Sequence, residues 1–139
     1  MSIADFTGTI LDELRLVLSR TPAAEADAFV ADILSARRIF VAGAGRSGLA
    51  GRAFAMRLMH FGFDSFVIGE IATPAYSKDD LLVVCSGSGE TGSLVSIAEK
   101  ARRIGGKIAL VTIVPDSRIG KLADRRLTLP APSPKAKAG

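Results

Sequence analysis

The stretch Ser86-Gly87-Ser88-Gly89-Glu90-Thr91 decides the fold of this chain, because it joins two segments of different periodicity. Before it lies Leu81-Leu82-Val83-Val84-Cys85, a short apolar run that is typical of a buried strand. After it, in residues 92–104, apolar side chains recur at helical spacing. A turn rich in glycine and hydroxyl groups between a buried strand and a helix indicates an α/β protein.

The same turn predicts a site for a phosphate group. A strand-to-helix turn points several backbone N–H groups at one spot, and the helix dipole adds positive potential there. Gly87 and Gly89 let the backbone approach an anion without a Cβ in between, while Ser86, Ser88 and Thr91 add hydroxyl donors. The alternative is an ordinary helix N-cap formed by Ser88 or Gly89. A cap needs one such residue rather than six, so we favour the phosphate site.

Strand patterns and helix patterns alternate through the rest of the chain. We expect strands at 38–42, 65–68, 81–85, 107–113 and 125–129, and helices at 47–61, 92–104 and 115–123. Such alternation predicts right-handed crossovers and a parallel sheet. A ligand should then lie beyond the carboxyl ends of the strands, where the strand order reverses and where both glycine-rich turns fall.

Two helices are expected before the first strand, in a prefix spanning residues 1–37. The first ends near Arg20, with a stripe formed by Ile3, Phe6, Ile10, Leu14 and Val17. Thr21 is the expected N-cap of the second, which has Pro22 in its first turn and runs to about Ala36. We expect the prefix to cover the sheet or to form a subunit contact. Helix 47–61 is apolar on two sides, which also favours an oligomer.

Length and composition indicate one domain, residues 1–129, followed by a low-complexity tail, 130–139, that we expect to be disordered. One cysteine among 139 residues excludes an internal disulfide, and Cys85 is expected to be a buried, reduced thiol. The acidic N-terminal segment lacks the basic region of a secretory signal, and no apolar run has the length of a membrane span. We therefore expect a cytoplasmic protein without a membrane partner.

The net charge of +4 does not indicate a nucleic-acid partner, because Lys135 and Lys137 in the tail supply half of it. The remaining basic residues are scattered, and eight aromatic residues provide no stacking platform. The positive bias near Arg46, Arg52 and Arg57 fits a small anionic ligand. The alternative is that these arginines are solvated or pair across a subunit contact.

The first glycine-rich turn raises a second hypothesis. Gly43, Gly45 and Gly48 match G-x-G-x-x-G after a strand, and Glu70 lies about 20 residues further on, where a ribose-binding acid would fall in a dinucleotide site. Five expected strands are one fewer than the two-halved dinucleotide fold has, and the second turn has no role in that fold. A Walker phosphate loop is excluded, because its G-x-x-x-x-G-K-[ST] pattern does not occur.

Three motifs together, at 43–48 (GAGRSG), 86–91 (SGSGET) and 115–117 (PDS), resemble the sugar isomerase (SIS) domain from Ile39 to Leu129. Within that superfamily the segments 40–49 (FVAGAGRSGL), 56–62 (MRLMHFG) and 122–124 (LAD) are similar to 6-phospho-3-hexuloisomerase. The resemblance implies a three-layer α/β sandwich with a flavodoxin-like, five-stranded parallel sheet and N-terminal helices. It also implies a homotetramer.

The resemblance further implies that Ser47 and residues 86–91 bind a phosphorylated sugar. The reaction would interconvert 3-hexulose 6-phosphate and fructose 6-phosphate through an enediol, a step of formaldehyde fixation in the ribulose monophosphate pathway, without metal or other cofactor. The family's proposed base is a glutamate after the fifth strand. This sequence has Pro130–Gly139 there, so we assign no residue to that role. The alternatives are a phosphosugar-binding SIS module without catalysis and another isomerase, such as one for arabinose 5-phosphate.

Four further residues are candidates for the site, besides Gly45 in the first turn. His60, the only histidine, matches a family histidine implicated in ring opening or proton transfer; otherwise it is a histidine packed at a helix end. Glu90 is either a base or a capping partner in the first turn of a helix. Glu70 either orients sugar hydroxyls or is solvated in its loop, and Arg46 either binds phosphate as a fork-shaped donor or bridges subunits.

Overall fold

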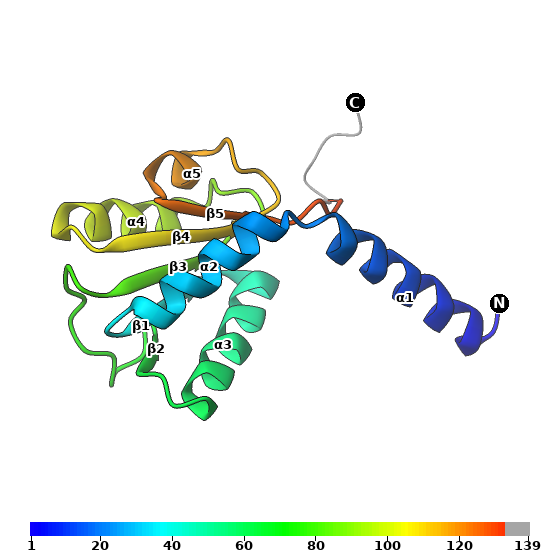
Figure 1. Cartoon of the computed structure of the whole chain (residues 1–139), viewed down its shortest axis with the longest axis horizontal. Helices are drawn as coiled ribbons and strands as arrows, with labels where there is room; N and C mark the ends of the chain where they lie inside the picture. The colour runs from blue at the N-terminus through cyan, green and yellow to red at the C-terminus, as the bar shows by residue number, and fades with distance from the viewer. Residues whose placement is uncertain (133–139) are drawn as a thin grey trace.

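The computed structural model of this chain describes residues 1–132. Its five strands form one parallel sheet in the order β2-β1-β3-β4-β5 (Figure 1), which confirms the predicted flavodoxin-like α/β fold. The strands are β1 (Ile39–Gly43), β2 (Ser65–Val67), β3 (Leu81–Cys85), β4 (Lys107–Thr112) and β5 (Arg125–Thr128). The chain leaves β1 toward β2 on one side and returns to β3 on the other. The strand order therefore reverses between β1 and β3, where open parallel sheets bind ligands.

Helices cover both faces of the sheet and make it the middle of three layers (Figure 1). One face packs against α2 and α3, the other against α4 and α5. The helices are α1 (Ile3–Arg20), α2 (Ala23–Ser35), α3 (Gly45–His60), α4 (Gly92–Ile104) and α5 (Arg118–Leu122). The sequence of β1 is apolar throughout because both faces of the strand are buried. Phe40 faces the α4 layer, Val41 faces the α3 layer, and each is at most 1% exposed.

Helix α1 stands apart from these layers and extends away from the body of the domain (Figure 1). None of its residues is buried, and Phe6, Ile10 and Leu14 in its apolar stripe are 50–55% exposed. Of the two prefix helices, only α2 covers the sheet. None of the helices within residues 1–132 has the combination of length and apolar character needed to cross a membrane.

The junction of α1 and α2 corrects one prediction. Thr21 does not cap α2; its hydroxyl donates to the carbonyl oxygen of Val17 (3.0 Å) and closes the last turn of α1. Pro22 is the residue before α2, which begins without a side-chain cap. Of the predicted disordered tail, residues 133–139 lie outside the described part of the chain.

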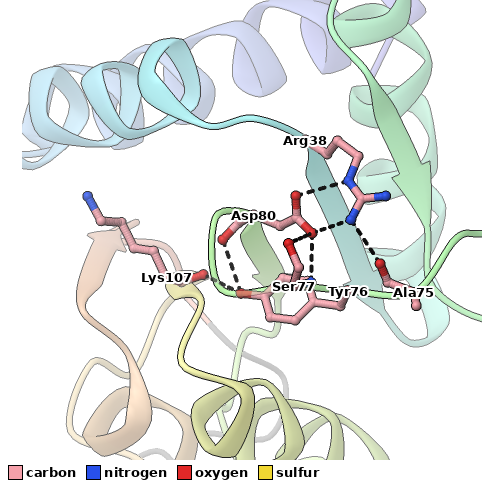
Figure 2. Close-up of polar contacts among 6 residues, drawn as sticks. All are labelled: Arg38, Ala75, Tyr76, Ser77, Asp80 and Lys107. Atoms are coloured by element: carbon pink, nitrogen blue, oxygen red, sulfur yellow. Dashed lines mark hydrogen bonds and ion pairs between the residues drawn. The ribbon is translucent and has the colours of Figure 1, made fainter.

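A buried ion pair fastens the end of the sheet opposite the carboxyl ends of the strands (Figure 2). Arg38, before β1, donates from Nε (3.0 Å) and Nη2 (2.6 Å) to the carboxylate of Asp80, before β3, which is 2% exposed. Ser77 adds its N–H and its hydroxyl to the same carboxylate. Burial alone would raise the pKa of the Asp80 carboxyl, but these hydrogen bonds outweigh burial and lower it below its ordinary value.

The same corner holds the loop between β2 and β3. Arg38 Nη2 also donates to the carbonyl oxygen of Ala75 (2.9 Å), and the Tyr76 hydroxyl lies 2.9 Å from the carbonyl oxygen of Lys107 at the start of β4 (Figure 2). Burial raises the pKa of the Tyr76 phenol, so it stays a neutral donor. These contacts fix the starts of β1, β3 and β4 relative to one another, and thereby the carboxyl ends one strand-length away.

Two acidic side chains attach α2 to the sheet. Asp32, 5% exposed, accepts from Lys107 Nζ and Arg125 Nε, both at 2.8 Å. Burial opposes its charge, yet the bonds from Arg125 and Lys107 outweigh it and lower the pKa of Asp32. Glu25 accepts from the backbone N–H of Thr128 (2.7 Å), which occupies a donor on the edge strand β5.

Candidate functional site

The two glycine-rich turns meet at one cavity of about 410 Å³, beyond the carboxyl ends of β1 and β3. We call it the rim cavity; it is lined by Ala44, Arg46, Ser47, Cys85, Ser86, Gly87, Ser88, Thr91, Leu94, Ile113 and Pro132. Ser47 from the first turn and Ser88 from the second therefore share one concave site, as the sequence predicted.

Unpaired backbone donors border this cavity. Within residues 1–132, the N–H groups of Gly87, Ser88 and Thr91 have no hydrogen-bond partner. The N–H of Gly89 donates to Ser86 Oγ (3.1 Å) and that of Glu90 to Ser88 Oγ (3.2 Å), so part of the loop is satisfied internally. Unpaired N–H groups beside side-chain hydroxyls provide the donor set that an oxyanion requires.

Two helices begin at the cavity without a side-chain cap. Ala44 precedes α3 and cannot cap it, and Thr91 precedes α4 without making a side-chain cap bond. The alternative weighed against the phosphate site, in which Ser88 or Gly89 caps α4, therefore does not hold. The first N–H groups of a helix have no partner within the helix, and the macrodipole places positive potential there. An anion in the rim cavity would face both uncapped helix starts.

The first turn needs glycine for close packing. A Cβ on Gly43 would lie 2.8 Å from the Cα of Gly48, and one on Gly48 would lie 2.7 Å from the carbonyl oxygen of Gly43. The end of β1 and the first turn of α3 can thus approach this closely only because both positions are glycine. Their contact sets Arg46 and Ser47, which lie between them in sequence, at the cavity wall.

The second turn is braced from behind by residues 112–119. The carbonyl oxygen of Gly87 accepts from the N–H groups of Ile113 (3.1 Å) and Val114 (3.2 Å), and from Thr112 Oγ1 (3.1 Å). That of Gly89 accepts from the N–H of Ile119 (3.0 Å). Both carbonyls are thereby held away from a bound anion, which they would repel.

An apolar groove of about 370 Å³ adjoins the rim cavity and shares five lining residues with it: Ser47, Cys85, Ser86, Gly87 and Ile113. Its apolar lining includes Phe29, Phe54, Leu127 and Leu129. Burial raises the pKa of the Cys85 thiol to about 11, so the thiol is protonated at neutral pH. Cys85 is a free cysteine, as predicted, but it is partly exposed rather than buried, because it lies at the end of β3 where both hollows open.

The chain matches the SIS domain family over residues 32–138, which include both turns and every strand. The chain belongs to the SIS domain family.

Two relatives of this chain are named as isomerases of one hexulose phosphate. A Bacillus subtilis protein named 3-hexulose-6-phosphate isomerase is 47% identical over 135 residues, covering 97% of this chain and 72% of the relative. A Methanocaldococcus jannaschii protein of the same name is 45% identical, covering 80% of this chain and 60% of the relative. The chain thus spans about 60% to 72% of the length of these two relatives.

Solved structures show the same SIS fold. A hypothetical protein superposes with a TM-score of 0.85 at 41% identity, covering 91% of this chain and 67% of the other. A Methanococcus jannaschii protein, whose crystal structure was used to infer a 3-hexulose-6-phosphate isomerase, superposes with a TM-score of 0.75 at 42% identity, covering 81% and 63%.

Five predicted residues do not line the rim cavity. Gly45, the exposed first residue of α3, lies between the lining residues Ala44 and Arg46 in sequence without lining the cavity itself. Gly89 is buried and packs closely against Ser117, and the carboxylate of Glu90 accepts from the backbone N–H of Arg118 (2.8 Å). Glu70 pairs with Arg52 at 2.9 Å, both side chains being about half exposed. His60 is exposed at the last residue of α3, about 20 Å along the helix from Ser47 at 1.5 Å per residue. Glu90 was expected in the first turn of a helix, but it lies two residues before α4, and its carboxylate accepts from the first residue of α5 instead.

The dinucleotide hypothesis fails on the sheet. Its fold has the strand order 3-2-1-4-5-6, whereas this SIS sheet has five strands in the order β2-β1-β3-β4-β5.

Sequence reasoning missed the bracing role of Thr112 and of Ser117, whose hydroxyl accepts from Gly120 N at the start of α5. The Pro-Asp-Ser motif at 115–117 contains Ser117, but in the sequence it indicated only a resemblance to the SIS family and not a bracing contact.

Proposed function

We propose that this SIS domain binds a phosphorylated ketohexose in the rim cavity and interconverts 3-hexulose 6-phosphate and fructose 6-phosphate. The observation that carries the proposal is the convergence of unpaired N–H groups, hydroxyls and two uncapped helix starts on one cavity. The shared name of the two relatives above supplies the reaction. Sugar phosphates are metabolites of the cytoplasm, and we place the protein there.

In this proposal the phosphoryl group lies against the 86–91 loop. The N–H groups of Gly87 and Ser88 and the hydroxyls of Ser47, Ser88 and Thr91 donate to its oxygens, and Arg46 adds a cationic fork. Each hydrogen bond to a charged acceptor contributes about 1.5–3 kcal/mol. Ser86 is 4% exposed and its oxygen already accepts from Gly89, so it mainly supports the loop.

The isomerisation moves a proton between C2 and C3 through an enediol, which needs a base at the carbon and a donor at the carbonyl oxygen. Among the described residues that line the cavity, only Arg46 and Cys85 ionise, and the Cys85 pKa of about 11 leaves the thiol protonated. The proton-transfer group is therefore contributed from outside this lining set. We propose His60 of a second copy as one contributor, since His60 is exposed far from its own cavity.

This role for His60 requires an assembly, and we propose a homotetramer. Helix α1 presents its apolar stripe to solvent, and α3 exposes Leu49, Met56 and Met59 (48–70%). Burying a large apolar side chain contributes about 1.5–3 kcal/mol, so a monomer forgoes much stabilisation at these surfaces. Light scattering of the purified chain tests this, and a monomer at micromolar concentration would contradict it.

The functional test couples fructose 6-phosphate formation to a reporter reaction and measures phosphosugar affinity by calorimetry. Ser88→Ala and Thr91→Val each remove one proposed phosphate donor. We expect each to weaken fructose 6-phosphate binding about tenfold or more, because a lost bond of 1.4 kcal/mol is a factor of ten. Ser93→Ala, an exposed serine of α4 that does not line the cavity, is the matched control. Unchanged affinity in both cavity variants would refute the site.

A second candidate is an SIS module that binds the phosphosugar without turning it over. It is favoured by the lack of a carboxylate or imidazole among the described residues of the cavity lining. Tight binding of fructose 6-phosphate with no turnover at high protein concentration would select this candidate. Measurable turnover would exclude it.

A further inference from the structure

We infer that Glu90 is a positioning residue that latches the 86–91 loop to the start of α5 and so keeps the loop's unpaired N–H groups directed into the rim cavity. The inference rests on the proposed function, because it names what holds the phosphate-binding groups in place. Its observation is the 2.8 Å hydrogen bond from the backbone N–H of Arg118 to Glu90 Oε1.

The latch completes a brace that otherwise involves backbone carbonyls and one threonine. Residues 112–119 hold the carbonyl oxygens of Gly87 and Gly89 through four donors at 3.0–3.2 Å. A peptide unit has its N–H and C=O on opposite sides. The carbonyl of Gly87, fixed toward residues 112–114, therefore leaves the N–H of Ser88 in the same peptide unit free to face the cavity. The carbonyl of Gly89 is fixed in the same way, and the N–H of its peptide unit, that of Glu90, donates to Ser88 Oγ. Glu90 extends this fixation to the end of the loop, next to Thr91.

No other side chain of the loop makes such a contact within residues 1–132. The oxygens of Ser86 and Ser88 accept from N–H groups inside the loop, and Thr91 lines the cavity. Glu90 alone crosses to the β4–α5 segment, 28 residues away in sequence.

The latch also resolves an electrostatic conflict. A carboxylate directed into the cavity would repel a phosphate, yet Glu90 lies in the middle of the proposed binding loop. Its carboxylate instead faces the start of α5 and does not line the cavity. Released from Arg118, the side chain would no longer be held away from the anion, and Gly89, at φ +64°, would lose a neighbouring restraint on its backbone.

Three variants test this role. Glu90→Ala removes the acceptor, Glu90→Gln keeps an acceptor oxygen without the charge, and Glu99→Ala removes an exposed glutamate of α4 that has no described partner. Binding of fructose 6-phosphate and of inorganic phosphate is measured by calorimetry well below the unfolding temperature. Amide hydrogen exchange at Arg118 is measured without ligand.

We expect Glu90→Ala to weaken binding of both ligands about five- to tenfold and to accelerate exchange of the Arg118 amide. Glu90→Gln should stay within about threefold of wild type in affinity and in exchange rate. In the coupled assay the change should fall on KM rather than kcat. Wild-type affinity in Glu90→Ala, or equal damage in Glu90→Gln, would overturn the inference; loss of kcat alone in Glu90→Gln would instead indicate a base. If the wild-type protein bound neither ligand, the proposed function would fail, and the Arg118 amide would still test the latch.

Discussion

Replacing Gly89 by alanine should damage the 86–91 loop through one identifiable clash. Gly89 has φ +64°, and an added Cβ would overlap Ser117 Oγ and lie 2.6 Å from Ser117 Cβ. The left-handed conformation costs an L-residue about 1–2 kcal/mol. Overpacking against a buried neighbour costs about 1–3 kcal/mol more. We therefore expect Gly89→Ala to lower the free energy of unfolding by at least 2 kcal/mol, measured by urea denaturation.

The double variant Gly89→Ala with Ser117→Gly separates the two costs. Glycine at 117 removes both atoms that the new Cβ would meet, while replacing a helix cap by glycine costs only a few tenths of a kcal/mol. The double variant should regain the free energy of unfolding lost to overpacking, and only the cost of the left-handed conformation at residue 89 should remain. Gly92→Ala, with open space around its Cβ, is the control and should change stability by less than 1 kcal/mol. Additive effects in the double variant would refute the clash.

Further predictions concern Asp80, before β3, and Cys85, the last residue of β3. Asp80→Asn should destabilise the fold by about 3 kcal/mol in urea denaturation, because it leaves the Arg38 guanidinium beside a neutral, partly unsatisfied partner. Because the pKa of Asp80 is lowered in the folded state, the ion pair stabilises the fold above the ordinary aspartate pKa, and this stabilisation is lost as the pH falls from there through the lower pKa of the folded state. The free energy of unfolding of Asp80→Asn should therefore fall less steeply with decreasing pH than that of the wild type. Equal slopes of the two curves would contradict this. Cys85, with a pKa of about 11, should react with iodoacetamide far more slowly at pH 7.5 than a free thiol does, and alkylation at the free-thiol rate would show that the burial is wrong.

The sequence predicted the parts of the fold that depend on local patterns. Each of the five strands lies within one or two residues of its predicted bounds, because apolar runs and glycine turns mark strands directly. The shared cavity of Ser47 and Ser88 followed from topology, since parallel strands place their carboxyl ends at one edge. The phosphate-binding roles of these residues stay predictions.

Contacts that hold the fold together were not predictable in this way. Asp32 pairs with Lys107 and Arg125, which are 75 and 93 residues away, and Arg38 pairs with Asp80 across 42 residues. In sequence these residues look like any solvated charge, and only the strand order brings them together. The same holds for Glu90: its position in a first turn suggested a cap, but its partner Arg118 belongs to another helix.

His60 shows the remaining limit of local reasoning. A helical pattern gives the face on which a residue lies, and the helix rise gives its distance from the helix start. Those two facts place His60 at the end of α3 opposite the rim cavity. Whether it meets a cavity of another copy depends on an interface that one chain's sequence pattern does not encode.

The most direct test of the account is an amide chemical-shift titration of the whole chain with fructose 6-phosphate. We expect the N–H signals of Gly87, Ser88 and Thr91 to shift together and saturate with one dissociation constant, while those of Gly105 and Gly106, at the opposite end of α4, do not move. If the phosphosugar left the three loop amides unshifted, or shifted only signals outside the rim cavity, the 86–91 loop would not be its binding site.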